Sequence, residues 1–211
     1  SVREQGLNGF HMAAACRQRP FIALGLASTG YLRLDATLLG PLTDAATLGL
    51  YAAAYRVLGV FSLIGSAFGT VFFARVAASP TEAGPVKAAT FLLLTVVAVP
   101  AVVIFIFAPS IVTAAFGSSY AGAAGPLRIL MLSVLPWSMY WPTAHFLNAA
   151  GRERHFATIL AVATCVNIAA LVALSGRLGA AGAATAWVVA ACVTMLLCLL
   201  ALRRWIRPSP P

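Results

Sequence analysis

Long apolar stretches separated by short polar segments dominate the sequence. The stretches run over residues 20–40, 46–76, 87–108, 126–149, 156–175 and 181–202. Each supplies about 20 mostly apolar residues or more, which is the length a helix needs to cross a bilayer. The runs are continuous and rich in Ala and Leu, whereas the strands of a membrane barrel alternate in polarity. The pattern therefore predicts an all-α, polytopic membrane helix bundle with six transmembrane helices.

The polar ends of the chain divide it into three parts. Residues 1–19 are too polar to cross a membrane and lack the apolar core of a signal peptide, so we predict a cytoplasmic lead-in or linker. Residues 20–204 form the predicted six-helix transmembrane lobe, and the Pro-rich residues 205–211 form a cytoplasmic tail. Because the chain does not begin with Met, we expect it to continue upstream.

Basic residues are distributed very unevenly between the two sides of the predicted membrane. Ten of the fourteen fall on one side: Arg3, Arg17, Arg19, Arg75, Lys87, Arg152, Arg154, Arg203, Arg204 and Arg207. The other side carries Arg177, and the remaining three lie within predicted spans. Since cytoplasmic loops are enriched in Lys and Arg, we predict a multi-pass protein of the cytoplasmic (inner) membrane with both termini in the cytoplasm.

Composition and charge exclude several classes of function. Hydrophobic residues make up 61% of the chain and charged residues 9%, which is outside the range of soluble enzymes. The net charge of +9 does not indicate a nucleic-acid partner, because the basic residues lie in short clusters between apolar stretches. The four cysteines lack metal-ligand spacing, and no nucleotide-binding, nucleophile or paired acidic motif occurs. We therefore predict no enzymatic activity, no cofactor and no metal site.

Arg33, Asp35 and Arg56 are ionisable residues within predicted spans. Such a side chain costs about 2.5–3.5 kcal/mol at the centre of a spanning helix, so each needs a partner or a wet cavity. Asp35 and Arg56 lie at similar depths in antiparallel spans and could pair, whereas Arg33 points about 200° away from Asp35 around their helix. Two interpretations stay open: a hydrated substrate or ion pathway, or a buried ion pair with Arg33 extending to the interface. The pathway is favoured, because a buried ion pair seldom offsets its desolvation.

The fourth apolar stretch contains two prolines, Pro136 and Pro142, which should kink or locally unwind its helix. Three aromatic residues lie between them: Trp137, Tyr140 and Trp141. These rings could stack on a sugar or fill space between helices, and packing is the commoner use.

Other polar and small residues within the spans fit helix packing. Gly65 and Gly69 form a GxxxG motif that allows a close helix contact, and Asn167 should hydrogen-bond to another helix. Arg128 is expected to extend to the membrane interface, and His145 to be a packing histidine.

Four stretches of the chain carry motifs in a distinctive order. They are Tyr31-Leu32-Arg33-Leu34-Asp35 through Gly49-Leu50-Tyr51-Ala52-Ala53-Ala54-Tyr55-Arg56, Phe107-Ala108-Pro109-Ser110-Ile111-Val112 through Phe116-Gly117-Ser118-Ser119-Tyr120 and Leu127-Arg128-Ile129-Leu130, Leu147-Asn148-Ala149-Ala150-Gly151-Arg152, and Asn167-Ile168 through Gly176-Arg177-Leu178-Gly179-Ala180-Ala181-Gly182-Ala183-Ala184. Together they resemble the carboxy-terminal half of a polysaccharide flippase of the multidrug/oligosaccharidyl-lipid/polysaccharide exporter superfamily.

The resemblance implies two six-helix lobes around a central cavity. Such a protein moves an undecaprenyl-diphosphate-linked oligosaccharide across the cytoplasmic membrane by alternating access. With six predicted spans, this chain would be one lobe. Its implied partners are the lipid-linked oligosaccharide, membrane lipids, and either a missing amino-terminal lobe or a second copy of itself.

The resemblance also implies which residues contact the substrate. Arg33 and Arg56 would attract the diphosphate headgroup, and Asp35 would orient them or take part in coupling. The secondary candidates for the cavity are Tyr31, Tyr55, Trp137 and Asn167.

Two departures from the family pattern keep other functions open. Ser118-Ser119 stand where an acidic residue is common, and Leu171 stands where a second asparagine is common, which weakens the case for ion coupling there. One alternative is a sodium- or proton-coupled multidrug or metabolite antiporter with Asp35 as the coupling carboxylate, although a pocket for cationic drugs should not be lined by two arginines. The other is a non-transporting membrane subunit of a glycan-assembly complex.

Overall fold

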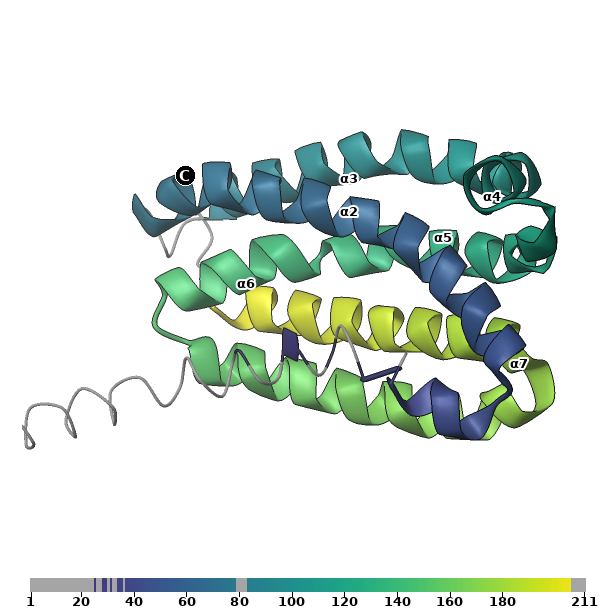
Figure 1. The fold of residues 1–211 in the computed structure, drawn as a ribbon. Helices are drawn as coiled ribbons and strands as arrows, with labels where there is room; N and C mark the ends of the chain where they lie inside the picture. Colours follow the sequence, from purple (N-terminus) through teal and green to yellow (C-terminus); the bar gives the residue numbers. More distant parts are fainter. Residues whose placement is uncertain are drawn as a thin grey trace, which may run out of the picture.

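The computed structural model describes residues 25, 28, 29, 31, 34, 35, 37–78 and 83–205. In this part of the chain every regular element is a helix, which confirms the prediction of an all-α membrane protein. The helices run roughly parallel or antiparallel in an elongated bundle (Figure 1). Large apolar side chains such as Leu63, Phe91 and Val99 are more than two-thirds exposed, at 70%, 74% and 67%. In a chain of this composition, that outer surface is solvated by lipid.

Helix α2 (Ala45–Ala78) begins at Ala45, two residues after a helical segment over residues 37–42. The Asp44 Oδ1 atom accepts a hydrogen bond of 3.3 Å from the backbone N–H of Thr47, so Asp44 caps the helix. Hydrogen bonds from the side chain and the backbone of Thr47 hold the pKa of the Asp44 carboxyl below its usual value. At 34 residues, α2 is about 50 Å long and exceeds the hydrocarbon thickness of about 30 Å.

Helices α3 (Ala83–Ile106) and α4 (Ala108–Phe116) meet at Phe107 with a bend of 82°. Pro109 lies at the start of α4 and has no backbone N–H, so it cannot donate to the carbonyl of Phe105 and continue α3. The short helix α4 therefore lies across one end of the bundle and leads into the 3₁₀ helix η1 (Ser118–Ala123). We call this the α4 end of the molecule (Figure 1).

The fourth apolar stretch is broken, as its prolines predict. Helix α5 (Ala124–Ser138) ends at Ser138, and α6 (Tyr140–Ala149) begins directly after Met139. Pro142 cannot donate to the carbonyl of Ser138, so the helical hydrogen-bond ladder is interrupted at this point.

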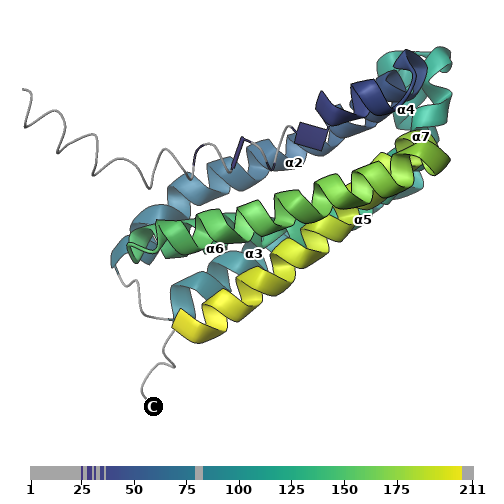
Figure 2. The same cartoon turned by 90° about the horizontal axis from the view of Figure 1, so that it is seen from below.

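Helix α7 (Glu153–Trp205) is interrupted at Gly179, whose φ of 54° and ψ of −130° are not helical. The chain reverses there, so α7 consists of a first arm, 153–178, and a second arm, 180–205, which lie side by side in both views (Figures 1 and 2). A Cβ atom on Gly182 would lie 2.4 Å from the carbonyl oxygen of Leu174, so the small-residue run allows the arms to approach closely just after the turn.

The number of spans stays a prediction. Within the described residues, Ala45–Gly69 and Glu153–Arg204 are long and apolar enough to cross a membrane, and the bent α3–α4 pair would make a third candidate. The break at Gly179 gives each arm of α7 the length of one span. The first predicted span, 20–40, lies mostly outside the described residues, as do the predicted lead-in 1–19 and most of the tail.

The GxxxG motif of α2 packs against α6. A Cβ atom on Gly65 would lie 2.1 Å from Nε1 of Trp141, and one on Gly69 would lie 1.9 Å from Nε2 of His145. Both rings therefore rest directly on the backbone of α2, in the space that the missing Cβ atoms leave. The predicted close contact is confirmed, and His145 is a packing residue as expected.

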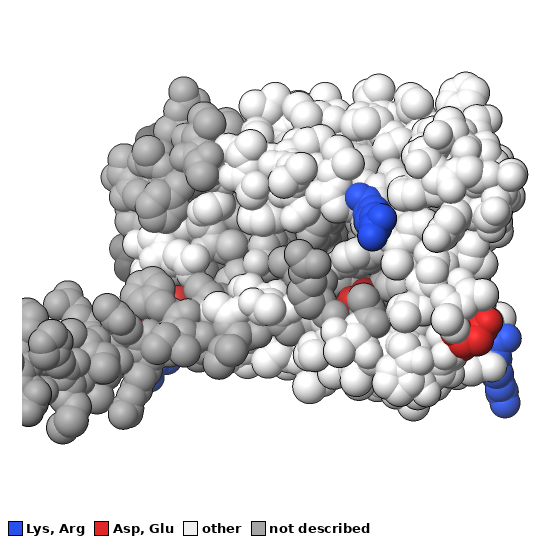
Figure 3. Space-filling model, in the orientation of Figure 1, with Lys and Arg blue, Asp and Glu red and all other residues white. Residues whose placement is uncertain are grey.

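Charged side chains are rare on the surface of the bundle. Figure 3 shows one face on which the described residues are almost all uncharged, with isolated basic and acidic side chains. The core that positions the polar residues lies among α2, α5, α6 and α7, and its largest fully buried side chains include Trp187, Tyr31, Tyr51, Phe146 and Phe156.

Candidate functional site

Asp35 is buried inside the bundle with 1% of its surface exposed. The hydroxyl of Tyr51 on α2 donates a hydrogen bond to its Oδ2 atom. A carboxylate in a non-polar interior is costly unless it is hydrogen-bonded, so this contact supports the burial of Asp35. The structure thus pairs Asp35 with Tyr51 instead of Arg56: Arg56 is exposed, and within the described part of the chain no ion pair joins the two residues.

Aromatic rings form a continuous cluster beside this hydrogen bond. Trp187, on the second arm of α7, is fully buried at its centre. Its ring centroid lies 5.3 Å from that of Tyr31, 5.4 Å from Tyr55 and 6.0 Å from Trp137. Tyr55 in turn lies 5.7 Å from Tyr51. The cluster therefore connects the buried carboxylate to the surface of α2, with ring separations in the favourable range for aromatic pairs.

A second polar contact ties the first span to the last. The Thr194 hydroxyl donates to the carbonyl of Ala190 at 2.8 Å and lies within hydrogen-bonding distance of the Tyr31 hydroxyl, at 3.0 Å. The ring of Tyr31 also stacks on Tyr140 of α6 with an interplanar angle of 7° and a centroid distance of 6.0 Å. Tyr31 is thus held from three sides, by α6 and by both Trp187 and Thr194 of α7.

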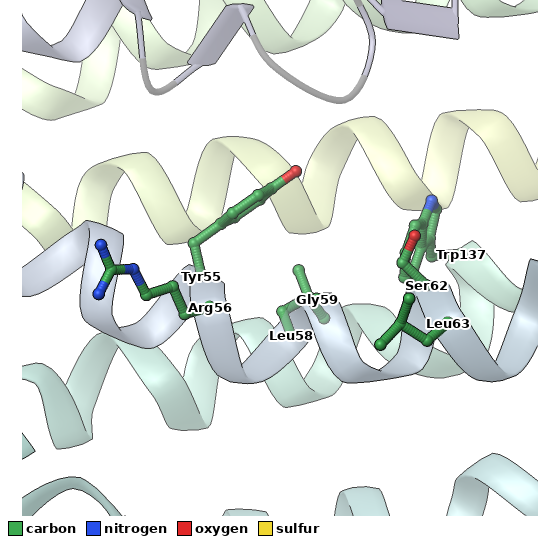
Figure 4. A pocket seen from close by; sticks show the side chains of 7 residues that line it. All are labelled: Tyr55, Arg56, Leu58, Gly59, Ser62, Leu63 and Trp137. Carbon is green, nitrogen blue, oxygen red and sulfur yellow. The ribbon is translucent and has the colours of Figure 1, made fainter. Parts of the chain in front are cut away.

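A pocket of about 290 Å³ opens between α2 and α5, next to the aromatic cluster. Its lining consists of Tyr55, Arg56, Leu58, Gly59, Ser62, Leu63 and Trp137. Figure 4 shows Tyr55 and Arg56 projecting from consecutive positions of α2, and Trp137 reaching the pocket beside Ser62. The pocket therefore combines one exposed guanidinium, two aromatic rings and a hydroxyl in an otherwise apolar wall.

The structure brings most of the predicted site residues together. Tyr31, Asp35, Tyr55 and Trp137 belong to one connected set of hydrogen bonds and ring contacts, and Arg56 lies at its edge in the pocket. Arg33 lies outside the described residues.

Asn167 does not behave as the sequence predicts. It is buried at 2% exposure, but its Oδ1 atom has no hydrogen-bond partner among the described residues. The expected hydrogen bond to another helix is therefore not found for this atom, and no described contact joins Asn167 to the pocket.

Sequence reasoning missed Tyr51, Trp187 and Thr194 as members of the site. A signal for Tyr51 was available, because Tyr51 and Tyr55 are four residues apart and so share one face of a helix. Trp187 and Thr194 stand in an apolar run like any other, and only the fold of the α7 hairpin brings them to Tyr31.

The chemistry of the arrangement is that of binding. Among the described residues, no three His, Cys, Asp or Glu side chains come together as metal ligands would. The exposed guanidinium can bind an anionic oxygen bidentately, and the rings and hydroxyls beside it offer flat apolar faces and hydrogen-bonding groups.

Comparison with known proteins gives one match. A family model described as polysaccharide biosynthesis protein matches residues 19–125, which is half of the chain and includes Asp35, Tyr51 and Arg56. No curated protein and no solved structure matches the chain.

Proposed function

Since the chain belongs to the polysaccharide biosynthesis protein family, whose members serve polysaccharide synthesis or export, we propose that it is one lobe of a flippase. Its substrate would be an undecaprenyl-diphosphate-linked oligosaccharide, such as a unit of O-antigen, capsule or exopolysaccharide. The lobe would work in the cytoplasmic membrane with both termini in the cytoplasm. Its partner would be an amino-terminal six-helix lobe or a second copy of the chain, moving against it by alternating access.

The observation that carries the proposal is the position of Arg56. It lies eleven residues after the start of α2, about 16 Å along the helix at 1.5 Å per residue. Counted from the first residue of the candidate span Ala45–Gly69, that is close to the middle of a hydrocarbon core of about 30 Å. An exposed arginine at this depth is unfavourable in lipid, so its side chain requires a hydrated cavity or an anionic partner.

A lipid-linked diphosphate supplies the anionic partner. The planar guanidinium of Arg56 can hold two phosphate oxygens with two parallel N–H donors, a geometry that a lysine ammonium does not offer. Tyr55 and Trp137 line the same pocket and offer aromatic faces to a sugar, while Ser62 offers a hydroxyl. The buried Asp35–Tyr51 hydrogen bond would fix the rings behind the pocket, since Tyr51 contacts Tyr55.

Glycan export in cells that depend on this protein tests the role of Arg56. Arg56→Gln should lower export about 10-fold or more, the loss expected when a charge-assisted hydrogen bond worth about 1.5–3 kcal/mol is removed. Surface glycan and membrane abundance of the protein would be measured together, so that a folding defect is recognised.

Arg177→Gln is the matched control, because Arg177 is also an exposed arginine but lies at the α7 turn, away from the pocket. It should export normally. Full export by Arg56→Gln would reject the assignment of Arg56. If Arg56→Gln lowers export at normal membrane abundance but no lipid-linked glycan accumulates on the cytoplasmic leaflet, a non-transporting subunit of a glycan-assembly complex is favoured.

A further inference from the structure

A second hollow lies on the outer surface of the bundle and shares no lining residue with the Arg56 pocket. It has a volume of about 250 Å³ and lies between α3 and α5. Its lining residues are Ala98, Ala101, Val102 and Phe105 from α3, and Met131, Leu132 and Leu135 from α5. We call it the α3–α5 groove.

The groove follows one stripe of each helix. On α3 the lining positions are spaced i, i+3, i+4 and i+7, and on α5 the same spacing runs from Arg128 through Met131 and Leu132 to Leu135. Seven residues of helix are about 10 Å long. The groove therefore spans most of one leaflet, whose hydrocarbon layer is about 15 Å thick.

Small and large side chains give the groove its shape. Ala101 and Met131 form its floor, with 5% and 4% of their surfaces exposed. Val102 and Leu132 form its walls and are more than half exposed, at 57% and 59%. An elongated apolar hollow with such walls fits a hydrocarbon chain lying along the helices.

The positively charged side chain of Arg128 lies next to the end of the groove that is nearest the α4 end. The Nε–H of Arg128 donates a hydrogen bond of 3.1 Å to the carbonyl of Phe105. This is the carbonyl that Pro109 leaves without a helical N–H donor, so Arg128 takes the place of the missing donor. Arg128 is thereby fixed beside Phe105, the last lining residue of α3.

The terminal amino groups of Arg128 face the surroundings without an acidic neighbour. Among the described residues Arg128 forms no ion pair, and its Nε bond is the only hydrogen bond of its side chain. A guanidinium held at the edge of the hydrocarbon layer favours an anionic partner, and a phosphate matches its remaining N–H groups. Charge and shape together select a ligand with a phosphate head and an apolar chain.

We propose that the α3–α5 groove with Arg128 is a binding site for an anionic glycerophospholipid. The phosphate contacts Arg128, and one acyl chain lies in the groove against Ala101 and Met131. The site is separate from the Arg56 pocket and does not depend on the flippase function.

Native mass spectrometry of the full chain, released from detergent after incubation with phospholipid, tests this site. Phosphatidylglycerol and phosphatidylcholine with identical acyl chains serve as the anionic and zwitterionic probes. Arg128→Gln should lower the retained phosphatidylglycerol about 10-fold, as expected for one lost charge-assisted contact, and should remove the preference over phosphatidylcholine. Arg177→Gln, an exposed arginine outside the groove, should retain both lipids like the unaltered protein.

A second variant tests the groove without touching the cation. Ala98→Leu places a larger side chain in the hollow and leaves Arg128 in place, so it should lower retention of both lipids. Excess inorganic phosphate should not displace phosphatidylglycerol, because the acyl chain contributes to binding. Unchanged retention by Arg128→Gln, displacement by inorganic phosphate, or a lipid-free dimer as the sole species would each overturn the proposal.

Discussion

The Asp35 carboxylate and the Tyr51 hydroxyl are 16 residues apart in the sequence and meet inside the bundle. Sequence reasoning identified Asp35 as a costly residue and left two interpretations open for it, a hydrated pathway or an ion pair with Arg56. Charge favoured Arg56, whereas the register between the first span and α2 brings Tyr51 to the carboxylate. Which residue of a helix faces a buried group depends on its rotation and axial position, and an apolar pattern with little amphipathicity does not fix either.

Tyr51→Phe tests the energetic weight of this contact. It removes the donor to Oδ2 of buried Asp35 and should lower the free energy of unfolding by about 1–3 kcal/mol. Denaturation in mixed micelles would measure the change. Tyr120→Phe is the control, because Tyr120 is 38% exposed on η1 and should show almost no effect. Equal stability of the two variants would contradict the role of the Tyr51 hydroxyl.

The helices themselves were largely predictable. Helix α2 begins and ends within two residues of the predicted stretch 46–76, and the break at Met139 falls between the two prolines. The predicted stretch 87–108 ends beside the bend at Phe107, but the helix α4 that follows the bend was not predicted. A continuous apolar run indicates that a segment is solvated by lipid. The direction of the helix depends instead on individual backbone donors and acceptors.

The α2–α6 contact gives a prediction with an internal control. Gly65→Ala should destabilise the protein by about 1–3 kcal/mol, since its Cβ would overlap the indole of Trp141. Gly59→Ala lies on the same helix with nothing within 4 Å of the new Cβ, and should stabilise by about 0.5–1 kcal/mol. Thermal unfolding in detergent would compare the two. A Gly65→Ala protein as stable as Gly59→Ala would show that the helices can separate without cost.

The cap of α2 should make this helix sensitive to acid. Because the pKa of Asp44 is lowered in the folded protein, the capping contribution is present above the ordinary carboxyl pKa and is lost as the pH falls through the lowered value. Asp44→Asn keeps a capping side chain but cannot titrate. The difference in melting temperature between the original protein and Asp44→Asn should therefore change between neutral and acidic pH. A constant difference would indicate that Asp44 does not titrate with folding.

At the scale of the whole molecule, the bundle has two ends with different chemistry. The α4 end carries α4, η1 and the Gly179 turn, and the opposite end carries the α6–α7 turn with Arg152 and Arg154 and the last residues of α7, including Arg203 and Arg204 (Figure 1). The sequence analysis, which counted basic residues on each side of the predicted membrane, led us to expect this uneven distribution.

Single-cysteine labelling in cells would test the orientation. In a background without the native cysteines, Ser118→Cys at the α4 end should react with a membrane-impermeant maleimide added outside. Arg152→Cys, in the turn at the other end, should react after the membrane is permeabilised. The reverse pattern would place the termini outside the cytoplasm.

The turn at Gly179 also bears on the order in which the chain folds. One glycine with a positive φ reverses the chain, so the arms of α7 meet across a very short loop. Closing a short loop costs little chain entropy, and contacts between residues close in sequence form quickly. The last fifty residues can therefore assemble as a helical hairpin before the distant pairings form. Tyr31 would then dock onto a surface of Trp187 and Thr194 that already exists, which makes the carboxy-terminal hairpin the template of the lobe.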